Sequence, residues 1–299
     1  MTKTPRPVLG CPPVRRNLAL LSVLALCCIG LPLAGAHPAP SSSRAHAAAP
    51  RVSYDTTVLD DKPAAYWTMG SPRSATEKDR TGHGHTGTYF GRPAATKLPN
   101  GETAADFDGK TEYMQVQDAA ALSTATRGVL TLEAWMRPDA LNFPVEGDTM
   151  RYMHWMGKGG ARNQEYVARF YSNTDPDRPN RISGYQYNLD GGKGAGSYFE
   201  GGIRAKTWIH YVLVINANAR TDSYPHGYIR IYRNGVREKT TDLSYRGTVI
   251  IPKRGKAPFR VGTRDLDTFF EGAIGKVAIY GKELPATRIK AHYAVMTRR

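Results

Sequence analysis

Residues 130–138 read LTLEAWMRP, and together with residues 269–280, FFEGAIGKVAIY, they decide the fold. In the first stretch every second residue from Leu130 to Met136 is apolar, which is the pattern of a strand that covers a core with one face. The other face carries Trp135, and a large aromatic residue there indicates a surface that is covered or used for contact. The two stretches therefore predict sheet architecture and say little about activity.

Beyond residue 52 the chain consists of short alternating runs separated by Gly, Asn, Asp and Pro, which predicts a single all-β domain. Ile274 and Val277 lie three residues apart, so both can face the core of one strand only across a bulge, which we place at Gly275. Residues 284–293 form the one convincing helix, because they carry a proline in the first turn and share apolar residues on one face.

The beginning of the chain is predicted to be a targeting segment. Residues 1–36 carry two adjacent arginines, an apolar run over 18–33 and the small-x-small motif Ala-Gly-Ala at 34–36, which together are typical of a signal peptide. Residues 37–51, rich in Ala, Pro and Ser, are predicted to be a disordered linker, and residues 52–297 are predicted to be the folded domain. We therefore expect a secreted, extracellular protein whose mature chain has no membrane span.

Cysteine usage and charge narrow the chemistry. All three cysteines, Cys11, Cys27 and Cys28, lie in the predicted signal peptide, so the mature chain has no disulfide, no catalytic thiol and no thiolate metal site. The net charge is +15, and removal of the four basic residues of the leader, which has no acids, leaves +11. Such a charge favours anionic partners, such as acidic polysaccharide or a cell-wall polymer, although scattered charges serve solubility equally well. No recognised nucleic-acid module is present, so no specific nucleic acid is expected.

Several motifs add up to a family pattern. They are Ala65-Tyr66-Trp67, Asp79-Arg80-Thr81-Gly82-His83-Gly84, Ala105-Asp106-Phe107-Asp108-Gly109, Trp208-Ile209-His210, Tyr232-Arg233-Asn234-Gly235 and the two stretches quoted first. From about residue 52 to residue 295 the sequence thereby resembles the laminin G-like, concanavalin A-like jelly-roll domains of secreted bacterial proteins. The resemblance implies an all-β jelly-roll sandwich of two antiparallel sheets, one of them concave, with one short C-terminal helix. Members bind sugars, proteins or calcium, and relatives of the same fold cleave polysaccharides.

Calcium is the one cofactor that the resemblance suggests. Family members commonly carry an acidic residue directly after the isoleucine of the penultimate strand, where it can ligate the ion, but this chain has Gly275 there, followed by Lys276. Asp106 and Asp108 could still contribute oxygen ligands, although turn aspartates are often simply turn formers. We therefore keep Ca²⁺ as a candidate cofactor with these two aspartates as candidate metal ligands.

Residues 151–199 are dense in groups that contact sugars. Alternation places Arg169 and Tyr171 on one face of their strand, and Tyr185 and Tyr187 on one face of theirs. If these faces are the concave ones, rings and arginine line a groove suited to stacking on sugars and pairing with uronate carboxylates. Alternatively, these tyrosines pack under loops. The candidate ligand-binding residues are Arg169, Tyr171, Tyr185, Tyr187, Asn188 and His154.

We predict a noncatalytic lectin-like module that binds carbohydrate or a cell surface through its concave sheet, and we assign no catalytic residue. A polysaccharide lyase is the first alternative, because the same cluster offers a carboxylate-neutralising arginine and a Tyr or His base. A glycoside hydrolase is less favoured, since Asp265, Asp267 and Glu271 do not match the carboxylate spacing of hydrolases of this fold. A protein adhesion module is a further alternative. His83 and His85, in a glycine turn without a third ligand, are interpreted as exposed loop residues.

Overall fold

Strands make up most of the computed structural model, which describes residues 52–143, 151–160, 163–189 and 192–298. The predicted signal peptide and linker lie outside the described residues. Two large sheets dominate, and all their strand pairs among these residues are antiparallel. The structure therefore confirms the predicted all-β sandwich of antiparallel sheets.

The first sheet contains both stretches that decide the fold, as neighbouring strands. Its order is β14 (Val236–Asp242), β13 (Tyr228–Arg233), β12 (Ile209–Asn216), β7 (Val129–Pro138), β18 (Glu271–Tyr280), β5 (Thr103–Asp108) and β4 (Ala94–Lys97), with β1 (Ala65–Trp67) also paired to β18. The central strands β7, β12 and β18 are buried along nearly their whole length, because this sheet is covered on both faces.

The second sheet carries most of the candidate ligand-binding residues. Its order is β11 (Gly194–Phe199), β10 (Ile182–Tyr187), β9 (Asn163–Tyr171), β8 (Tyr152–Gly160), β17 (Phe259–Val261), β6 (Tyr113–Val116), β3 (Gly87–Phe90) and β2 (Thr76–Glu77). A separate small hairpin pairs β15 (Ser244–Tyr245) with β16 (Thr248–Val249). The strands that supply the candidate residues, β8, β9 and β10, are therefore direct neighbours.

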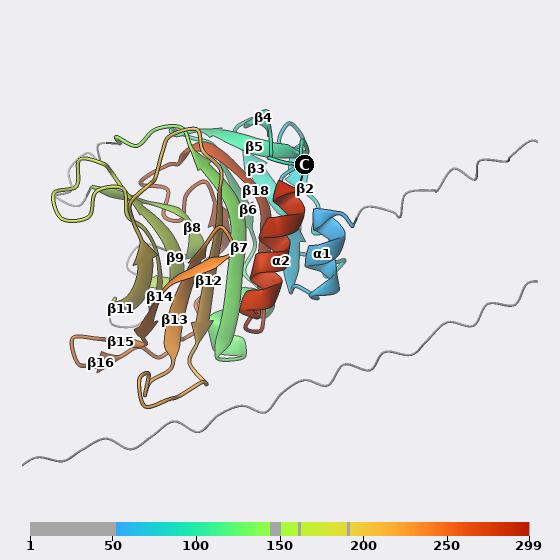
Figure 1. The fold of residues 1–299 in the computed structure, drawn as a ribbon. Helices are drawn as coiled ribbons and strands as arrows, with labels where there is room; N and C mark the ends of the chain where they lie inside the picture. Colours follow the sequence, from blue (N-terminus) through green and yellow to red (C-terminus); the bar gives the residue numbers. More distant parts are fainter. Residues whose placement is uncertain (1–51, 144–150, 161–162, 190–191, 299) are drawn as a thin grey trace, which may run out of the picture. The chain divides into compact units, whose positions relative to one another are not determined.

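Two α-helices lie side by side against the first sheet, as Figure 1 shows for α1 in blue and α2 in red. The predicted C-terminal helix is present as α2 (Ala286–Thr297), whereas α1 (Tyr54–Asp60) was missed. Its signal was Ser53, whose hydroxyl accepts the amide of Thr56 at 3.0 Å as a helix N-cap. Two short 3₁₀ turns, η1 (Ala120–Leu122) and η2 (Thr124–Thr126), precede β7.

The alternation of β7 divides its side chains between two hydrophobic clusters. Leu130, Leu132, Ala134 and Met136 are buried in the core between the sheets, as predicted. Trp135 points to the outer face, where its ring stacks on Tyr293 of α2 at 5.8 Å and meets Tyr54 of α1 edge-on at 6.5 Å. The large aromatic residue on the second face therefore marked a surface covered by helices.

The bulge predicted at Gly275 is present in β18. The pairing of β18 with β7 shifts register between Gly275 and Ala278, and Ile274 and Val277 both reach the core. Lys276 adopts the left-handed backbone conformation, with φ of 54°. Its buried ammonium group forms ion pairs with Asp55 at 2.5 Å and Glu102 at 2.7 Å.

Within the described residues, neither helix is long and apolar enough to span a bilayer.

Candidate functional site

Arg169 lies in β9 and points away from the core of the sandwich. Its neighbours Ala168 and Phe170 are fully buried between the two sheets, so strand alternation turns Arg169 to the outer face of the second sheet. The same alternation places Tyr171 on this face, as predicted. Only 8% of the Arg169 surface is exposed, so the guanidinium charge is largely removed from water.

Tyrosine rings surround the Arg169 guanidinium. The Cζ atom lies 3.9 Å from the ring centroid of Tyr152 and 4.6 Å from that of Tyr185, both within cation–π range. Nη1 donates a hydrogen bond to the Tyr171 hydroxyl at 3.1 Å, and Nη2 donates to the Tyr187 hydroxyl at 2.7 Å. The structure thus brings together the three predicted tyrosines and adds Tyr152, which the sequence analysis missed. We call these four tyrosines with Arg169 and His154 the arginine cluster.

Glycines of β11 make room for two of these rings. Gly196 pairs with Tyr185 and Gly194 pairs with Tyr187 in the β10–β11 ladder. A Cβ atom on Gly196 would lie 2.4 Å from the Tyr185 ring, and one on Gly194 would lie 2.7 Å from the Tyr187 ring. Both glycines therefore let a tyrosine ring lie flat across the neighbouring strand. This close approach explains why β11 carries glycine at these two positions.

His154 connects the cluster to a loop more than a hundred residues away. Its Nε2 accepts hydrogen bonds from Arg169 Nε at 3.2 Å and Nη2 at 3.1 Å. Because Nε2 accepts, we assign the ring proton to Nδ1, which donates to Asp265 Oδ2 at 2.8 Å and also lies 2.8 Å from Arg264 Nη2. Arg264 holds the same Asp265 oxygen at 2.6 Å.

Burial and positive neighbours keep His154 uncharged. Burial, together with the charges of Arg169 and Arg264, lowers the pKa of His154 to about 4, against the opposing pull of Asp265. Although burial raises the pKa of Asp265, its hydrogen bond from His154 and the charge of Arg264 bring that pKa down to about 2. At neutral pH the cluster therefore contains a neutral imidazole beside a guanidinium.

No carboxylate of the described residues forms an ion pair with Arg169. Its direct partners are the uncharged His154 and tyrosine hydroxyls. Burial raises the pKa of Tyr171, but the charge of Arg169 and hydrogen bonds from Tyr185, Arg169 and Arg178 outweigh it, so the pKa is lowered. A buried cation without a carboxylate partner is unusual, because buried charges are normally paired.

The cluster is only partly accessible. Arg169, Tyr171, Tyr187 and His154 are buried, and Arg178 donates to the Tyr171 hydroxyl at 2.9 Å. The alternative in which tyrosines pack under other groups therefore describes the centre of the cluster. Its rim remains half-buried and is formed by Tyr152 and Tyr185.

The remaining candidate residues make local contacts. Asn188 is half-buried and its Oδ1 accepts the backbone amide of Lys193 at 2.9 Å, which closes the β10–β11 turn. Asp106 accepts from Arg137 Nη2 at 3.1 Å. Asp108 Oδ1 accepts the backbone amides of Lys110, Thr111 and Glu112 at 2.8, 2.9 and 3.1 Å, as a turn former does.

A metal centre finds no further support in the part of the chain that the structure describes. No group of three or more His, Cys, Asp or Glu side chains there is arranged to hold a metal ion. The assignment of calcium to Asp106 and Asp108 stays a prediction.

Comparison with protein-family models agrees with the observed fold. The family model of the concanavalin A-like lectin/glucanases superfamily matches residues 108–290, which is more than half of the chain. The chain therefore belongs to this superfamily, as the sequence motifs indicated. No curated protein matches the sequence.

Solved structures with a similar fold include carbohydrate-binding proteins. Domain 4 of AbnA, a GH43 extracellular arabinanase from Geobacillus stearothermophilus solved with arabinotriose, is 17% identical with a TM-score of 0.49, over 78% of this chain and 98% of that chain. The binding domain of botulinum neurotoxin DC, solved with rat synaptotagmin II, is 12% identical with a TM-score of 0.57, over 80% of this chain and 52% of that chain. A structure of botulinum neurotoxin type C, a toxin whose cell entry depends on interaction with two ganglioside molecules, is 12% identical with a TM-score of 0.56. The match covers 80% of this chain and 52% of that chain. The chain thus spans about half the length of the toxin structures, and these likenesses show the fold alone.

Proposed function

We propose that this protein is a secreted, noncatalytic carbohydrate-binding module that recognises an acidic glycan on the outer face of the second sheet. The observation that carries the proposal is the buried Arg169 guanidinium, which has no carboxylate partner among the described residues. A ligand carboxylate at the rim would sit in the field of this cation, where the low local dielectric strengthens the attraction.

The rim of the arginine cluster offers the contacts that sugars use. Tyr152 and Tyr185 are half-buried, so part of each ring is available to the apolar face of a pyranose. Both rings are held in place by the Arg169 guanidinium, and Tyr185 also rests over Gly196. Aromatic rings that are already fixed lose little entropy when a ligand binds.

A polysaccharide lyase is the second candidate, and one observation favours it. The lowered pKa of Tyr171 beside Arg169 is what a tyrosine base next to a carboxylate-neutralising group needs. Only 1% of Tyr171 is exposed, however, and its hydroxyl is already bonded to Arg169 and Arg178. A base must reach the proton that it removes, so this burial supports binding over elimination.

A glycan array followed by titration calorimetry tests the proposal. Uronate-containing glycans should bind, and Tyr185→Ala should weaken them by roughly 2- to 10-fold, because ring stacking contributes about 0.5–1.5 kcal/mol. Tyr185→Phe should retain most of the affinity, since it keeps the ring. The matched control is Tyr245→Ala, which removes an exposed ring from the β15–β16 hairpin.

Three results would count against this assignment. Equal losses in the Tyr185→Ala and Tyr245→Ala variants would remove Tyr185 from the site. Accumulation of unsaturated uronate ends, seen as new ultraviolet absorbance with alginate or glucuronan, would establish the lyase instead. An array without any bound glycan, combined with capture of a protein that free sugars do not displace, would establish adhesion.

A further inference from the structure

A cavity of about 460 Å³ lies away from the arginine cluster, where four chain segments meet. They are the connection after α1, the turn between β2 and β3, the 3₁₀ segment before β7 and the connection from β18 to α2. Ser123 of this wall bonds to Glu165 at the start of β9. Arg169 lies four residues further along that strand, roughly 13 Å at the usual rise per residue.

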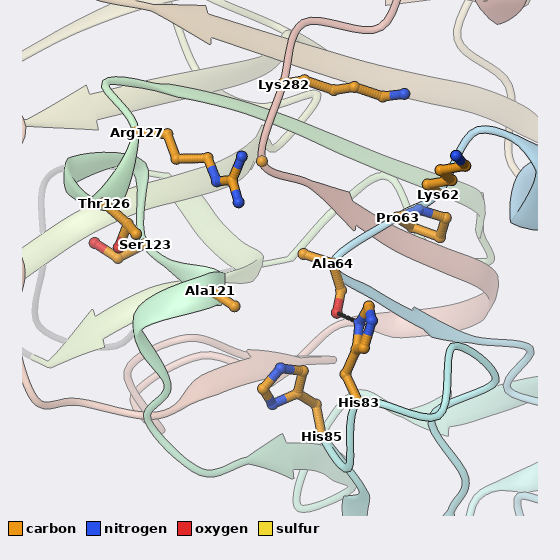
Figure 2. Close-up of a pocket in the computed structure, with 11 residues that line it drawn as sticks. Lys62, Pro63, Ala64, His83, His85, Ala121, Ser123, Thr126, Arg127 and Lys282 are labelled. Atoms are coloured by element: carbon orange, nitrogen blue, oxygen red, sulfur yellow. Dashed lines mark hydrogen bonds between the residues drawn. The ribbon is translucent and has the colours of Figure 1, made fainter.

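The wall of the cavity is basic. It contains Lys62, Arg127 and Lys282 together with His83 and His85, and none of the lining residues is acidic. Figure 2 shows these side chains arranged around the space between the segments. All three cations are exposed, and none has a carboxylate partner in the described part of the chain. Three unpaired positive charges around one cavity make it a region of positive potential.

Hydrogen bonds to buried groups hold the backbone of the turn that carries His83 and His85. Buried Asp79 accepts the backbone amides of Tyr66, Thr81 and His85 at 3.2, 3.0 and 3.1 Å. The His85 carbonyl accepts the indole N–H of Trp67 at 2.6 Å. The backbone of this turn is therefore anchored to the core, although His83 is exposed as predicted and His85 is half-buried. The imidazole of His83 is held by its Nδ1, which lies 2.9 Å from the Ala64 carbonyl oxygen.

The backbone near the three cations is also constrained. Lys62 adopts φ of 51°, a conformation in which any residue other than glycine or asparagine is uncommon. The Lys282 carbonyl accepts the Thr131 hydroxyl at 2.8 Å. A Cβ atom on Gly281 would lie 3.1 Å from Arg127 Cδ, so the missing side chain leaves room for the arginine stem.

We infer that this cavity, the basic pocket, is a second binding site, which takes an oxyanion: the carboxylate, sulfate or phosphate group of a small ligand. Lys62, Arg127 and Lys282 supply the charge, and His85 supplies a further hydrogen-bond donor or acceptor. The inference is independent of the proposed function, because the pocket shares no residue with the arginine cluster. The oxyanion can come from an acidic sugar or from free inorganic ion, and the experiment separates these sources.

The test follows the amide signals of Arg127, Gly281 and His85 by two-dimensional NMR while the protein is titrated. The probes are galacturonic acid, sodium sulfate and sodium phosphate, with galactose as the neutral control. Saturable shifts with galacturonic acid assign the site to acidic sugars, and shifts with sulfate or phosphate alone assign it to the inorganic ion. No shift with any of the three anions, or an equal response to galactose, would overturn the inference.

Variants then test the residues. The double variant Arg127→Gln/Lys282→Gln should bind the effective probe about 10-fold more weakly, since two exposed cations that pair with the anion are lost and solvent screens each pair. Arg237→Gln, which removes an exposed arginine of β14 outside the pocket, should change binding less than twofold. Equal weakening in both would show that overall charge, not the pocket, attracts the anion.

Lys62→Gly gives the sharpest single test. It removes a cation and relieves the positive φ, so affinity should fall several-fold while the melting temperature stays the same or rises. Unchanged affinity would exclude Lys62 from the site. Tyr185→Ala should leave the pocket response intact, so that failure of the glycan face and failure of the pocket can be told apart.

Discussion

The outer faces of the two sheets differ in how each accommodates one buried charge, Glu133 on the first sheet and Arg169 on the second. On the first sheet, beneath α1 and α2, Glu133 of β7 is fully buried. It accepts hydrogen bonds from the Tyr54 hydroxyl at 2.7 Å, the Tyr280 hydroxyl at 2.8 Å, His210 Nε2 at 2.8 Å and His292 Nδ1 at 2.9 Å. On the second sheet, Arg169 is surrounded by uncharged groups. Among the described residues, Glu133 therefore has histidine partners that balance its charge, whereas Arg169 has no carboxylate partner.

The histidines beside these charges respond in opposite directions. Both ring nitrogens of His292 face carboxylate oxygens, those of Glu133 and Asp61, so the ring can donate to both only when protonated. Although burial alone would lower it, the pKa of His292 is raised by Glu133 and Asp61. In turn, and against its own burial, the pKa of Glu133 is held well below its ordinary value by His292 and His210. The pKa of His154 beside Arg169 is lowered to about 4.

This difference is the basis for proposing that the second sheet, and not the first, carries the binding face. The Glu133 network links α1 and α2 to the first sheet and surrounds the Glu133 carboxylate with hydrogen-bond donors. The arginine cluster holds a cation that has no carboxylate partner among the described residues.

Removal of the Glu133 charge should be the most damaging change. Glu133→Gln places an amide among four donors and leaves protonated His292 without its buried partner, so we expect a loss of about 3–5 kcal/mol of unfolding free energy, as for other broken buried pairs. Urea unfolding at neutral pH measures it. Glu200→Gln, which breaks the exposed pair with Arg181, should cost less than about 1 kcal/mol. Similar small losses for both variants would mean that the Glu133 network is not an ionic anchor.

The pH dependence of stability should carry opposite contributions from the two histidines. Because the folded state lowers the pKa of His154 from 6.5 to about 4, the unfolded chain binds more protons in that interval and stability falls as pH decreases through it. The full contribution is on the order of 3 kcal/mol. Because the pKa of His292 is raised, its contribution is present below pH 6.5 and is lost as pH rises through the folded pKa.

Unfolding curves of His154→Asn and His292→Asn across this range measure the two contributions. The first variant should lose less stability than the wild type between pH 6.5 and 4. The second should lack the wild-type decline above pH 6.5. Parallel pH profiles for the two variants would contradict the opposite shifts.

Removal of the Arg169 charge should be the mildest of these changes. Arg169→Met fills a similar volume and removes a buried cation that has no carboxylate partner among the described residues. The desolvation cost of that charge is relieved, which offsets part of the four hydrogen bonds lost, so we expect a net cost of about 1–2 kcal/mol. The pKa of His154, followed by NMR titration, should rise from about 4 because a positive neighbour is gone. A loss of stability as large as that of Glu133→Gln would show that the cluster is structural, and it would weaken the case for a ligand there.

Local patterns in the sequence were sufficient for much of the architecture. Alternation in β7 identified its core face and the covered side of Trp135, and the three-residue spacing of Ile274 and Val277 located the bulge. The same alternation grouped Arg169 with its tyrosines, because neighbouring strands carry them. Short-range periodicity was enough for all of these features.

Features that depend on distant segments could not be predicted in this way. Tyr152 reaches the arginine cluster because it pairs with Tyr171 of the neighbouring strand, and Asp265 reaches His154 from 111 residues away. The burial of Tyr171 beneath Arg178 depends on how a loop folds back. The basic pocket draws its cations from three separate connections, none of which carries a motif.

The ring of donors around Glu133 also bears on how the chain folds. Tyr54 precedes this carboxylate by 79 residues and His292 follows it by 159, so both ends of the described domain must meet at its middle strand. Closure over such sequence separations is slow, and α2 is the C-terminal element of the described domain. A nascent chain in which α2 has not yet docked therefore lacks the His292 donor, and the network around Glu133 is complete only when this helix is in place.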